Sequence, residues 1–104
     1  MEIAISPSEK DILAKITGAI TESDSEAIKR AFEQLSASAH RVVKLDLSLV
    51  PTITSTGIGK IIILYKRLRQ QNKELVIFGI HDNLYSMFVS INLDKMLTIQ
   101  KNEQ

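Results

Sequence analysis

The sequence predicts an α/β fold in which a mixed β-sheet, opened by an N-terminal hairpin, packs against about three amphipathic helices. Two patterns carry this prediction. Apolar residues alternate with a period of two near the start of the chain, and farther on short apolar runs alternate with segments of helical spacing. Strands that alternate with helices are typical of a layered α/β domain. A chain of 104 residues suits one core of this kind, so we expect a single domain over residues 1–104.

The first two strands are expected to form a hairpin. Apolar side chains stand at every second position in two runs near the N-terminus, Ile3 and Ile5, then Ile12, Ala14 and Ile16. Residues 6–10 lie between the runs and contain two serines and a proline, which is typical of a turn. The chain therefore opens with two antiparallel strands.

The first helix is expected after Gly18. Ser23 and Glu26 have the spacing of a capping box, in which two side chains satisfy free backbone N–H groups at a helix start. Apolar residues then recur at intervals of three and four: Ala27, Ile28, Ala31, Phe32 and Leu35. Charged and polar residues occupy the other face, so this segment is predicted to be an amphipathic surface helix.

The middle of the chain is predicted to form a strand that leads through a short loop into a second helix. The strand residues show little alternation, which is typical of a strand buried on both faces: Val42, Val43, Leu45 and Leu47. Pro51 ends this strand. Over residues 56–69 the apolar side chains return to helical spacing: Ile58, Ile61, Ile62, Leu64, Tyr65 and Leu68.

The last third of the chain repeats the alternation of strand and helix. Residues 74–78 are predicted to form a buried strand ahead of Gly79. Asp82 or Asn83 is expected to cap a third helix. Its inward-facing residues would be Leu84, Met87, Phe88 and Ile91. Residues 96–99 supply a final strand.

Composition limits the classes of protein to which the chain can belong. Thirteen basic and twelve acidic residues give a net charge of +1, which argues against a nonspecific nucleic-acid-binding surface. The longest purely apolar run, residues 61–64, is far shorter than the roughly 20 residues of a membrane span. Cysteine is absent, and the N-terminus lacks the basic start and apolar stretch of a secretory signal. We expect a cytoplasmic protein with no direct contact to nucleic acid or membrane.

Residues that could carry catalysis are few. The two histidines, His40 and His81, stand where helix-end or turn residues are ordinary. No nucleophile, metal-ligand triad or second acid accompanies them in a pattern that catalysis requires. Gly57 and Gly59 form a G-x-G, but neither the third glycine of a dinucleotide fold nor the Gly-Lys-Ser/Thr of a phosphate loop follows. The sequence therefore predicts a protein that is not an enzyme and binds no metal or cofactor.

One segment carries a specific motif. Residues 43–59 form an apolar strand with Asp46 and Ser48 near its end, then a loop, then Ser55-Thr56-Gly57-Ile58-Gly59. This segment resembles the signature of the STAS domain family of anti-sigma factor antagonists. The resemblance extends over most of the chain, because the order of strands and helices, Gly18 before the first helix and Leu93-Asp94 near the end all have counterparts in that family. It implies a STAS-like layered domain.

Two positions depart from the family pattern. Thr54 stands where the family usually has an acidic or amide residue, immediately before its phosphorylated serine. Thr21 replaces an acidic residue that the family often has after Gly-x-Leu/Ile. A partner that reads those side chains in other members would meet a different surface here.

The resemblance implies partner switching by reversible phosphorylation of Ser55, with Thr54 and Thr56 as secondary candidates. Its partners would be an anti-sigma serine kinase and a metal-dependent serine phosphatase. Physical chemistry agrees with this acceptor, because a hydroxyl at a helix N-terminus is exposed and lies where free N–H groups and the helix dipole tolerate a phosphate. The implied partner-binding residues are Thr54, Thr56, Gly57, Lys60, Ile63 and Arg67.

Ile63 is singled out by its position in the helical pattern. It projects with Lys60, Arg67 and Gln70 and lies off the apolar stripe of the second helix. We therefore expect an isoleucine exposed among basic residues. Single exposed apolar residues are common on protein surfaces, and docking is the functional interpretation of this one.

Other functions fit the same residues. A phosphorylated regulator of this type can answer to a response-regulator kinase/phosphatase and control motility, secretion or biofilm formation. A ligand-binding or stressosome-like scaffold would need no phosphorylation. Ser55 or Thr54 could also serve only as a helix cap.

Overall fold

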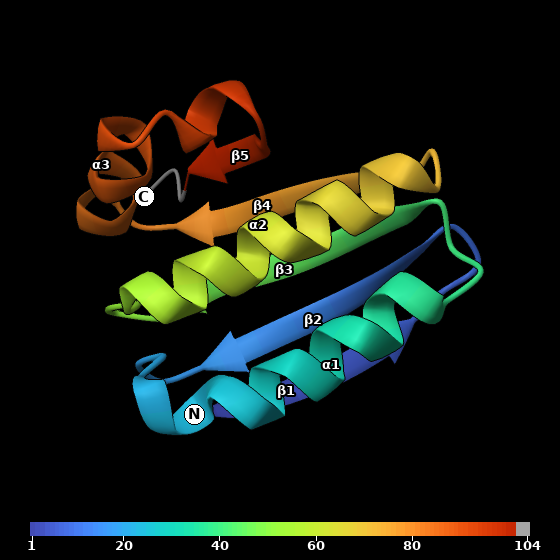
Figure 1. Cartoon of the computed structure of the whole chain (residues 1–104), viewed down its shortest axis with the longest axis horizontal. Helices are drawn as coiled ribbons and strands as arrows, with labels where there is room; N and C mark the ends of the chain where they lie inside the picture. The colour runs from blue at the N-terminus through green and yellow to red at the C-terminus, as the bar shows by residue number, and fades with distance from the viewer. Residues whose placement is uncertain (102–104) are drawn as a thin grey trace.

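A computed structural model describes residues 1–101 of the chain (Figure 1). The strands are β1 (Glu2–Pro7), β2 (Asp11–Thr17), β3 (Val42–Leu49), β4 (Glu74–Ile80) and β5 (Thr98–Lys101). The helices are α1 (Ser25–Ala37), α2 (Ser55–Gln70) and α3 (Asp82–Ser90), with the short 3₁₀ turns η1 (Glu22–Asp24) and η2 (Leu93–Lys95). The order of elements matches the sequence prediction.

The strands form one mixed sheet in the order β1-β2-β3-β4-β5. β1 and β2 pair in antiparallel fashion, with Ile3 opposite Ile16 and Ile5 opposite Ala14. The other neighbours, from β2 to β5, are parallel. The predicted N-terminal hairpin and α/β fold are therefore confirmed.

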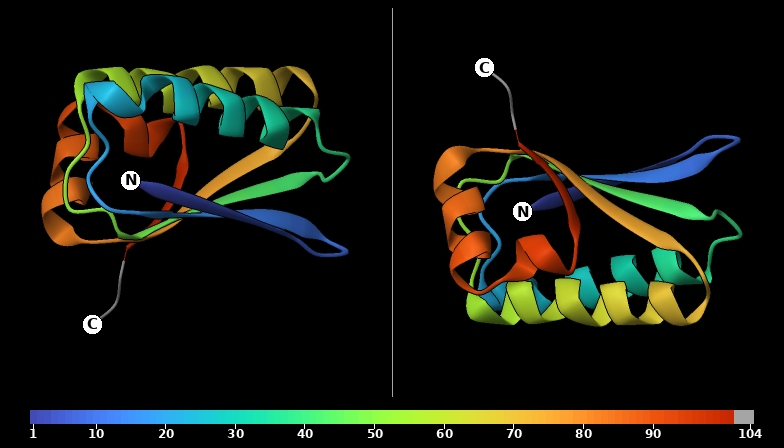
Figure 2. Two further views of the ribbon diagram at one scale, coloured as in Figure 1. Left: turned by 90° about the horizontal axis from the view of Figure 1, so that it is seen from below. Right: turned by 90° about the horizontal axis from the view of Figure 1, so that it is seen from above.

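Helices α1 and α2 lie side by side on one face of the sheet, and α3 lies at one end of it (Figure 2). The core is the layer between this helix pair and the sheet. From β3, Val43, Leu45 and Leu47 enter the core and are fully buried. At about 25 cal/mol per Å² of apolar surface removed from water, this layer is the main source of stability.

The prediction that the strand in the middle of the chain is buried on both faces is wrong. In β3, Val43, Leu45 and Leu47 alternate with residues that are only partly buried, Val42, Lys44 and Asp46. Side chains of a strand point alternately to opposite faces, and α1 and α2 cover only one of them (Figure 2). Lys44 on the other face pairs with Asp11 of β2 at 3.1 Å.

The predicted capping box at Ser23 and Glu26 is also wrong, because the box forms two positions earlier, between Thr21 and Asp24. The backbone N–H of Thr21 donates to Asp24 Oδ2 at 2.8 Å, and the backbone N–H of Asp24 donates to the carbonyl of Thr21 at 3.0 Å. These bonds close the turn η1, after which α1 begins at Ser25. The short side chain of Asp24 suits the tight 3₁₀ turn.

The third helix is capped by His81 and neither by Asp82 nor by Asn83. His81 Nδ1 accepts the backbone N–H of Leu84 at 3.4 Å, and its Nε2 lies 3.1 Å from the carbonyl oxygen of Val50. One imidazole tautomer satisfies both bonds, with the proton on Nε2. His81 therefore joins the start of α3 to the loop after β3.

Two details near the C-terminus differ from the prediction. Ile91, expected to face inward, is 47% exposed because α3 ends at Ser90. The final strand begins at Thr98, two residues later than expected, because the chain first turns through η2. Asn92 makes this turn possible with a left-handed backbone, φ 63°, a conformation that asparagine tolerates better than most residues.

The bond at the start of α1 predicts a dependence of stability on pH. The backbone N–H of Thr21 holds the pKa of Asp24 below its usual range. The stabilisation is therefore complete above the ordinary carboxyl value of about 4 and is lost as the pH falls through the lowered pKa. We expect Asp24→Asn to unfold at lower urea concentration than the wild type at pH 7, with the difference vanishing in strong acid.

Glu26→Gln is the matched control, since it removes one carboxylate from the same helix start without touching this bond. Urea unfolding followed by circular dichroism at several pH values measures the free energies of unfolding. A difference between Asp24→Asn and wild type that stays constant with pH would contradict the prediction.

Candidate functional site

The motif segment lies at the edge of the sheet where the parallel strands end. The loop after β2 and the loop after β3 pair there through an isolated parallel bridge between Ile20 and Ile53. The backbone N–H of Ile20 donates to the carbonyl of Thr52 at 3.0 Å, and the N–H of Thr54 donates to the carbonyl of Ile20 at 3.1 Å. The loop that leads into α2 is therefore held in place by backbone bonds. The carboxyl edge of parallel strands is where α/β proteins commonly place their sites.

The first turn of α2 divides capping and exposure between two neighbouring hydroxyls. Thr54 is the N-cap, in an extended conformation, and its Oγ1 accepts the backbone N–H of Gly57 at 3.3 Å. Ser55 is the first residue of the helix, and its side chain is exposed. Because Thr54 makes the capping bond, the Ser55 hydroxyl is not needed to cap the helix. It lies at the positive end of the helix dipole.

Glu22 reaches this site from η1. Thr56 Oγ1 donates to Glu22 Oε2 at 2.7 Å, across 34 positions of sequence. The sequence prediction missed this carboxylate, although Glu22 directly follows Thr21, the position where the family pattern often has an acid. The site thus has a negative side chain next to Thr56. It comes from Glu22, the residue that follows Thr21 in the chain.

Gly57 has a packing role. It is buried, and a Cβ added there would lie 2.7 Å from Ile53 Cγ1 and 2.9 Å from Ile20 Cγ2. Carbon atoms in proteins do not approach one another so closely, so Ile20 or Ile53 would have to move to make room for the Cβ. Gly57 therefore packs against the bridge between the two loops, and its place in the partner-binding set stays a prediction.

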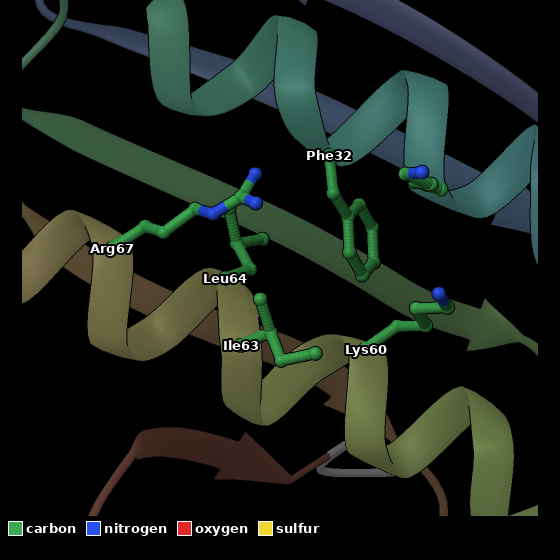
Figure 3. A pocket seen from close by; sticks show the side chains of 6 residues that line it. Phe32, Lys60, Ile63, Leu64 and Arg67 are labelled. Carbon is green, nitrogen blue, oxygen red and sulfur yellow. The ribbon is translucent and has the colours of Figure 1, made fainter.

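The remaining predicted binding residues lie farther along α2. Ile63 is 49% exposed, as expected from its position off the apolar stripe. Lys60, Ile63 and Arg67 line a hollow between α1 and α2 (Figure 3). They are thus brought together with one another, while Thr54, Ser55 and Thr56 form a separate group at the start of the helix.

Both histidines have structural partners. His40 Nε2 lies 2.7 Å from the carbonyl oxygen of Ser8, and His81 caps α3. Among residues 1–101, no group of three or more His, Cys, Asp or Glu side chains could hold a metal ion. In the same part of the chain, none of the helices combines the length and the apolar character needed to cross a membrane.

A family model, curated relatives and solved structures match this chain. The model of the STAS domain matches residues 3–104. The chain belongs to the STAS domain family. Among curated proteins of this family, the anti-sigma-B factor antagonist of Listeria monocytogenes is 32% identical over 106 aligned residues, which cover 99% of this chain and 93% of the relative.

Solved structures of other proteins share the fold at low sequence identity. An anti-sigma factor antagonist from Mycobacterium paratuberculosis is 16% identical and superimposes with a TM-score of 0.85, covering 95% of this chain and 84% of that one. The Bacillus cell fate determinant SpoIIAA in its phosphorylated form is 10% identical, with a TM-score of 0.74 over 94% of this chain and 90% of that one. At such identities the likeness establishes the fold.

The two glycines of the motif predict opposite effects of the same substitution. Gly57→Ala would force its methyl group against Ile20 and Ile53 and should lower the free energy of unfolding by about 1–3 kcal/mol. Gly59→Ala places its methyl group where no atom lies within 4 Å. It should raise the free energy of unfolding by about 0.5–1 kcal/mol, because alanine favours a helix more than glycine does.

Chemical unfolding of the two variants tests this difference. Gly59→Ala is the control for the change in helix propensity, since both glycines lie in α2. Equal stabilisation by the two substitutions would show that Gly57 is not packed as described.

Proposed function

We propose that this STAS protein is an anti-sigma factor antagonist that acts by partner switching, with Ser55 as the phosphate acceptor. The observation that carries the proposal is the exposed hydroxyl of Ser55 at the first position of α2, beside a threonine that already caps the helix. The antagonist name of the Listeria relative and the phosphorylated form of SpoIIAA support it. The proposal takes the chain as a single domain over residues 1–104 that works in the cytoplasm.

Electrostatics at the start of α2 explain how one phosphate would act as a switch. A phosphate adds a charge of about −1.5 to −2 at pH 7. The N–H groups and dipole of α2 tolerate that charge, so the fold need not rearrange. Glu22, bonded to Thr56, would add a second negative group close by. A partner surface that is apolar or acidic there would lose affinity.

The partners supply the chemistry in this proposal. Unmodified protein would bind an anti-sigma serine kinase and so release the sigma factor that the kinase holds. Phosphorylation of Ser55 by that kinase would end the complex, and a metal-dependent serine phosphatase would restore the binding form. The proposed contact surface lies at the start of α2 and along it. Its exposed side chains are Ile63 and Arg67, and it also contains the partly buried Thr54, Thr56 and Lys60 and the buried Gly57.

A second output is favoured by one specific observation. Thr54 stands where the family pattern usually has an acidic or amide residue, and Thr21 where it often has an acidic one. The kinase that reads this surface can therefore differ from an anti-sigma factor. In that case the same phosphorylation would report to a response-regulator kinase/phosphatase that governs motility, secretion or biofilm formation.

Phosphopeptide mass spectrometry of the protein from its native cells tests the acceptor. Trypsin releases residues 45–60, which contain Ser48, Thr52, Thr54, Ser55 and Thr56. Fragment ions separate the five hydroxyls. We expect phosphate on Ser55 under some growth conditions and not under others. A well-detected peptide that is unmodified in every condition would favour a scaffold or ligand-binding role.

The proposed switch predicts the behaviour of two substitutions at Ser55. Ser55→Asp should weaken binding to the kinase by about tenfold or more, which corresponds to about 1.4 kcal/mol, because it places a negative charge on the contact surface. Ser55→Ala should bind like the unmodified protein and accept no phosphate. Calorimetric titration with the kinase measures both. Equal affinity of the aspartate variant and the wild type would contradict the switch.

A further prediction concerns Ile63. Ile63→Asp should leave the fold intact and weaken binding to the same kinase, because the side chain is half exposed on the proposed contact surface. Ile91→Asp is the matched control, since Ile91 is 47% exposed and lies beyond the end of α3. Circular dichroism checks folding and calorimetry measures affinity. An unchanged affinity for Ile63→Asp would remove this residue from the interface.

A further inference from the structure

Helices α1 and α2 leave an apolar hollow between them. Phe32 of α1 and Leu64 of α2 form its floor and are 5% and 1% exposed, while Ile63 stands at its rim (Figure 3). The hollow has a volume of about 100 Å³. A cavity of about 150 Å³ lined by similar side chains can hold a benzene ring, so this one has room for a single aliphatic side chain.

Three cations surround this apolar floor. Lys29 of α1 and Lys60 and Arg67 of α2 line the hollow, and no carboxylate of residues 1–101 does. Within residues 1–101 the ion pairs are Lys44–Asp11 and Lys101–Asp82, so these three cations form none there. Glu26 and Glu33 flank Lys29 along α1 but do not pair with it in this part of the chain. The hollow therefore favours a ligand that is both apolar and acidic.

The cations of α2 are spaced like the residues of one helix face. Lys60 and Arg67 are seven positions apart, which is about two turns and about 10.5 Å along the axis. Ile63 and Leu64 stand midway between them. A second helix laid along this groove could present two carboxylates with the same spacing and an aliphatic side chain between them. Helix-in-groove recognition of this kind uses anchors spaced by three, four and seven residues.

We propose that the groove between α1 and α2 binds an acidic amphipathic helix of a partner protein. One aliphatic side chain of that helix enters the hollow over Phe32 and Leu64, and carboxylates on either side of it meet Lys60 and Arg67. Lys29 faces the same ligand from α1. Charge complementarity sets the orientation, and the apolar anchor supplies most of the affinity.

This inference rests on the proposed function only in taking α2 as a partner-binding surface. Ile63 lies eight residues beyond Ser55, about 12 Å along the helix, so the groove does not include the phosphate acceptor. Lys60, Ile63 and Arg67 belong both to the groove and to the proposed kinase contact surface. The two ideas fail in different experiments. Groove binding is measured without a kinase, and a protein that switches at Ser55 but binds no acidic helix would overturn the groove alone.

The probe is a synthetic alanine- and glutamine-based helical peptide, about five turns long, with two glutamates two turns apart and a leucine midway. Fluorescence anisotropy of the labelled peptide measures affinity, and amide shifts in a ¹⁵N–¹H spectrum locate the site. We expect shifts centred on Phe32, Ile63 and Leu64, and binding about tenfold weaker when the leucine is replaced by glutamine. Shifts confined to other surfaces would overturn the proposal.

Variants of the protein separate groove binding from general attraction between charges. The double variant Lys60→Glu with Arg67→Glu should bind the acidic peptide about tenfold or more weakly than the wild type does. It should instead bind a peptide with lysines in place of the glutamates. Lys15→Glu with Arg41→Glu makes the same change of charge at exposed sites outside the groove and should stay within about twofold of wild type. Equal weakening by both pairs would overturn the proposal.

Ile63→Gln keeps the test decisive if the charge-reversed protein does not fold, since it changes one half-exposed side chain. This variant should bind the acidic peptide about fivefold to tenfold more weakly than the wild type, and an unchanged affinity would overturn the proposal. Sedimentation velocity tests whether a second copy of the chain occupies the groove in place of a partner helix. Self-association that rises with concentration and is lost in Ile63→Gln, together with no peptide binding, would assign the groove to a second copy of the chain.

Discussion

The backbone hydrogen bonds of Ile20 are the constraint on which the candidate site depends. Ile20 donates to Thr52 and accepts from Thr54, so the loops after β2 and β3 form one unit. Gly57 packs on that unit because its missing side chain leaves room for Ile20 and Ile53. His81 joins the start of α3 to the same loop through Val50. The first turn of α2 therefore has a fixed place on the sheet, with Ser55 exposed at its start.

Most of the fold could be predicted because its signals are local and periodic. The hairpin and the alternation of strands and helices follow from apolar spacing in the sequence. The errors arise where spacing alone is ambiguous. Lys44 and Asp46 interrupt the apolar run of β3, yet a short run cannot tell which faces of a sheet the helices will cover. Thr21 with Asp24 and Ser23 with Glu26 offer competing capping boxes, and only the geometry of the turn decides between them.

The candidate site was predictable in part for a related reason. The motif around Ser55 is contiguous, so the sequence alone placed it at the start of a helix. The apolar spacing along that helix was enough to predict that Ile63 is exposed. Glu22 and the hollow over Phe32 depend on contacts between distant segments. The bond from Thr56 to Glu22 spans 34 positions, and the hollow exists only because α1 and α2 lie side by side. The spacing of apolar residues within one segment cannot predict contacts between segments that are far apart in the sequence.

The division of labour between Thr54 and Ser55 has an evolutionary consequence. Thr54 makes the capping bond that stabilises the helix start, and Ser55 is exposed beside it. Selection can therefore act on the two hydroxyls separately. Substitutions at Ser55 would alter the proposed regulation without loss of the cap, and a lineage that lost this regulation would keep a well-folded protein. A copy freed from its original partners could then acquire new ones through the same helix while its core stayed unchanged.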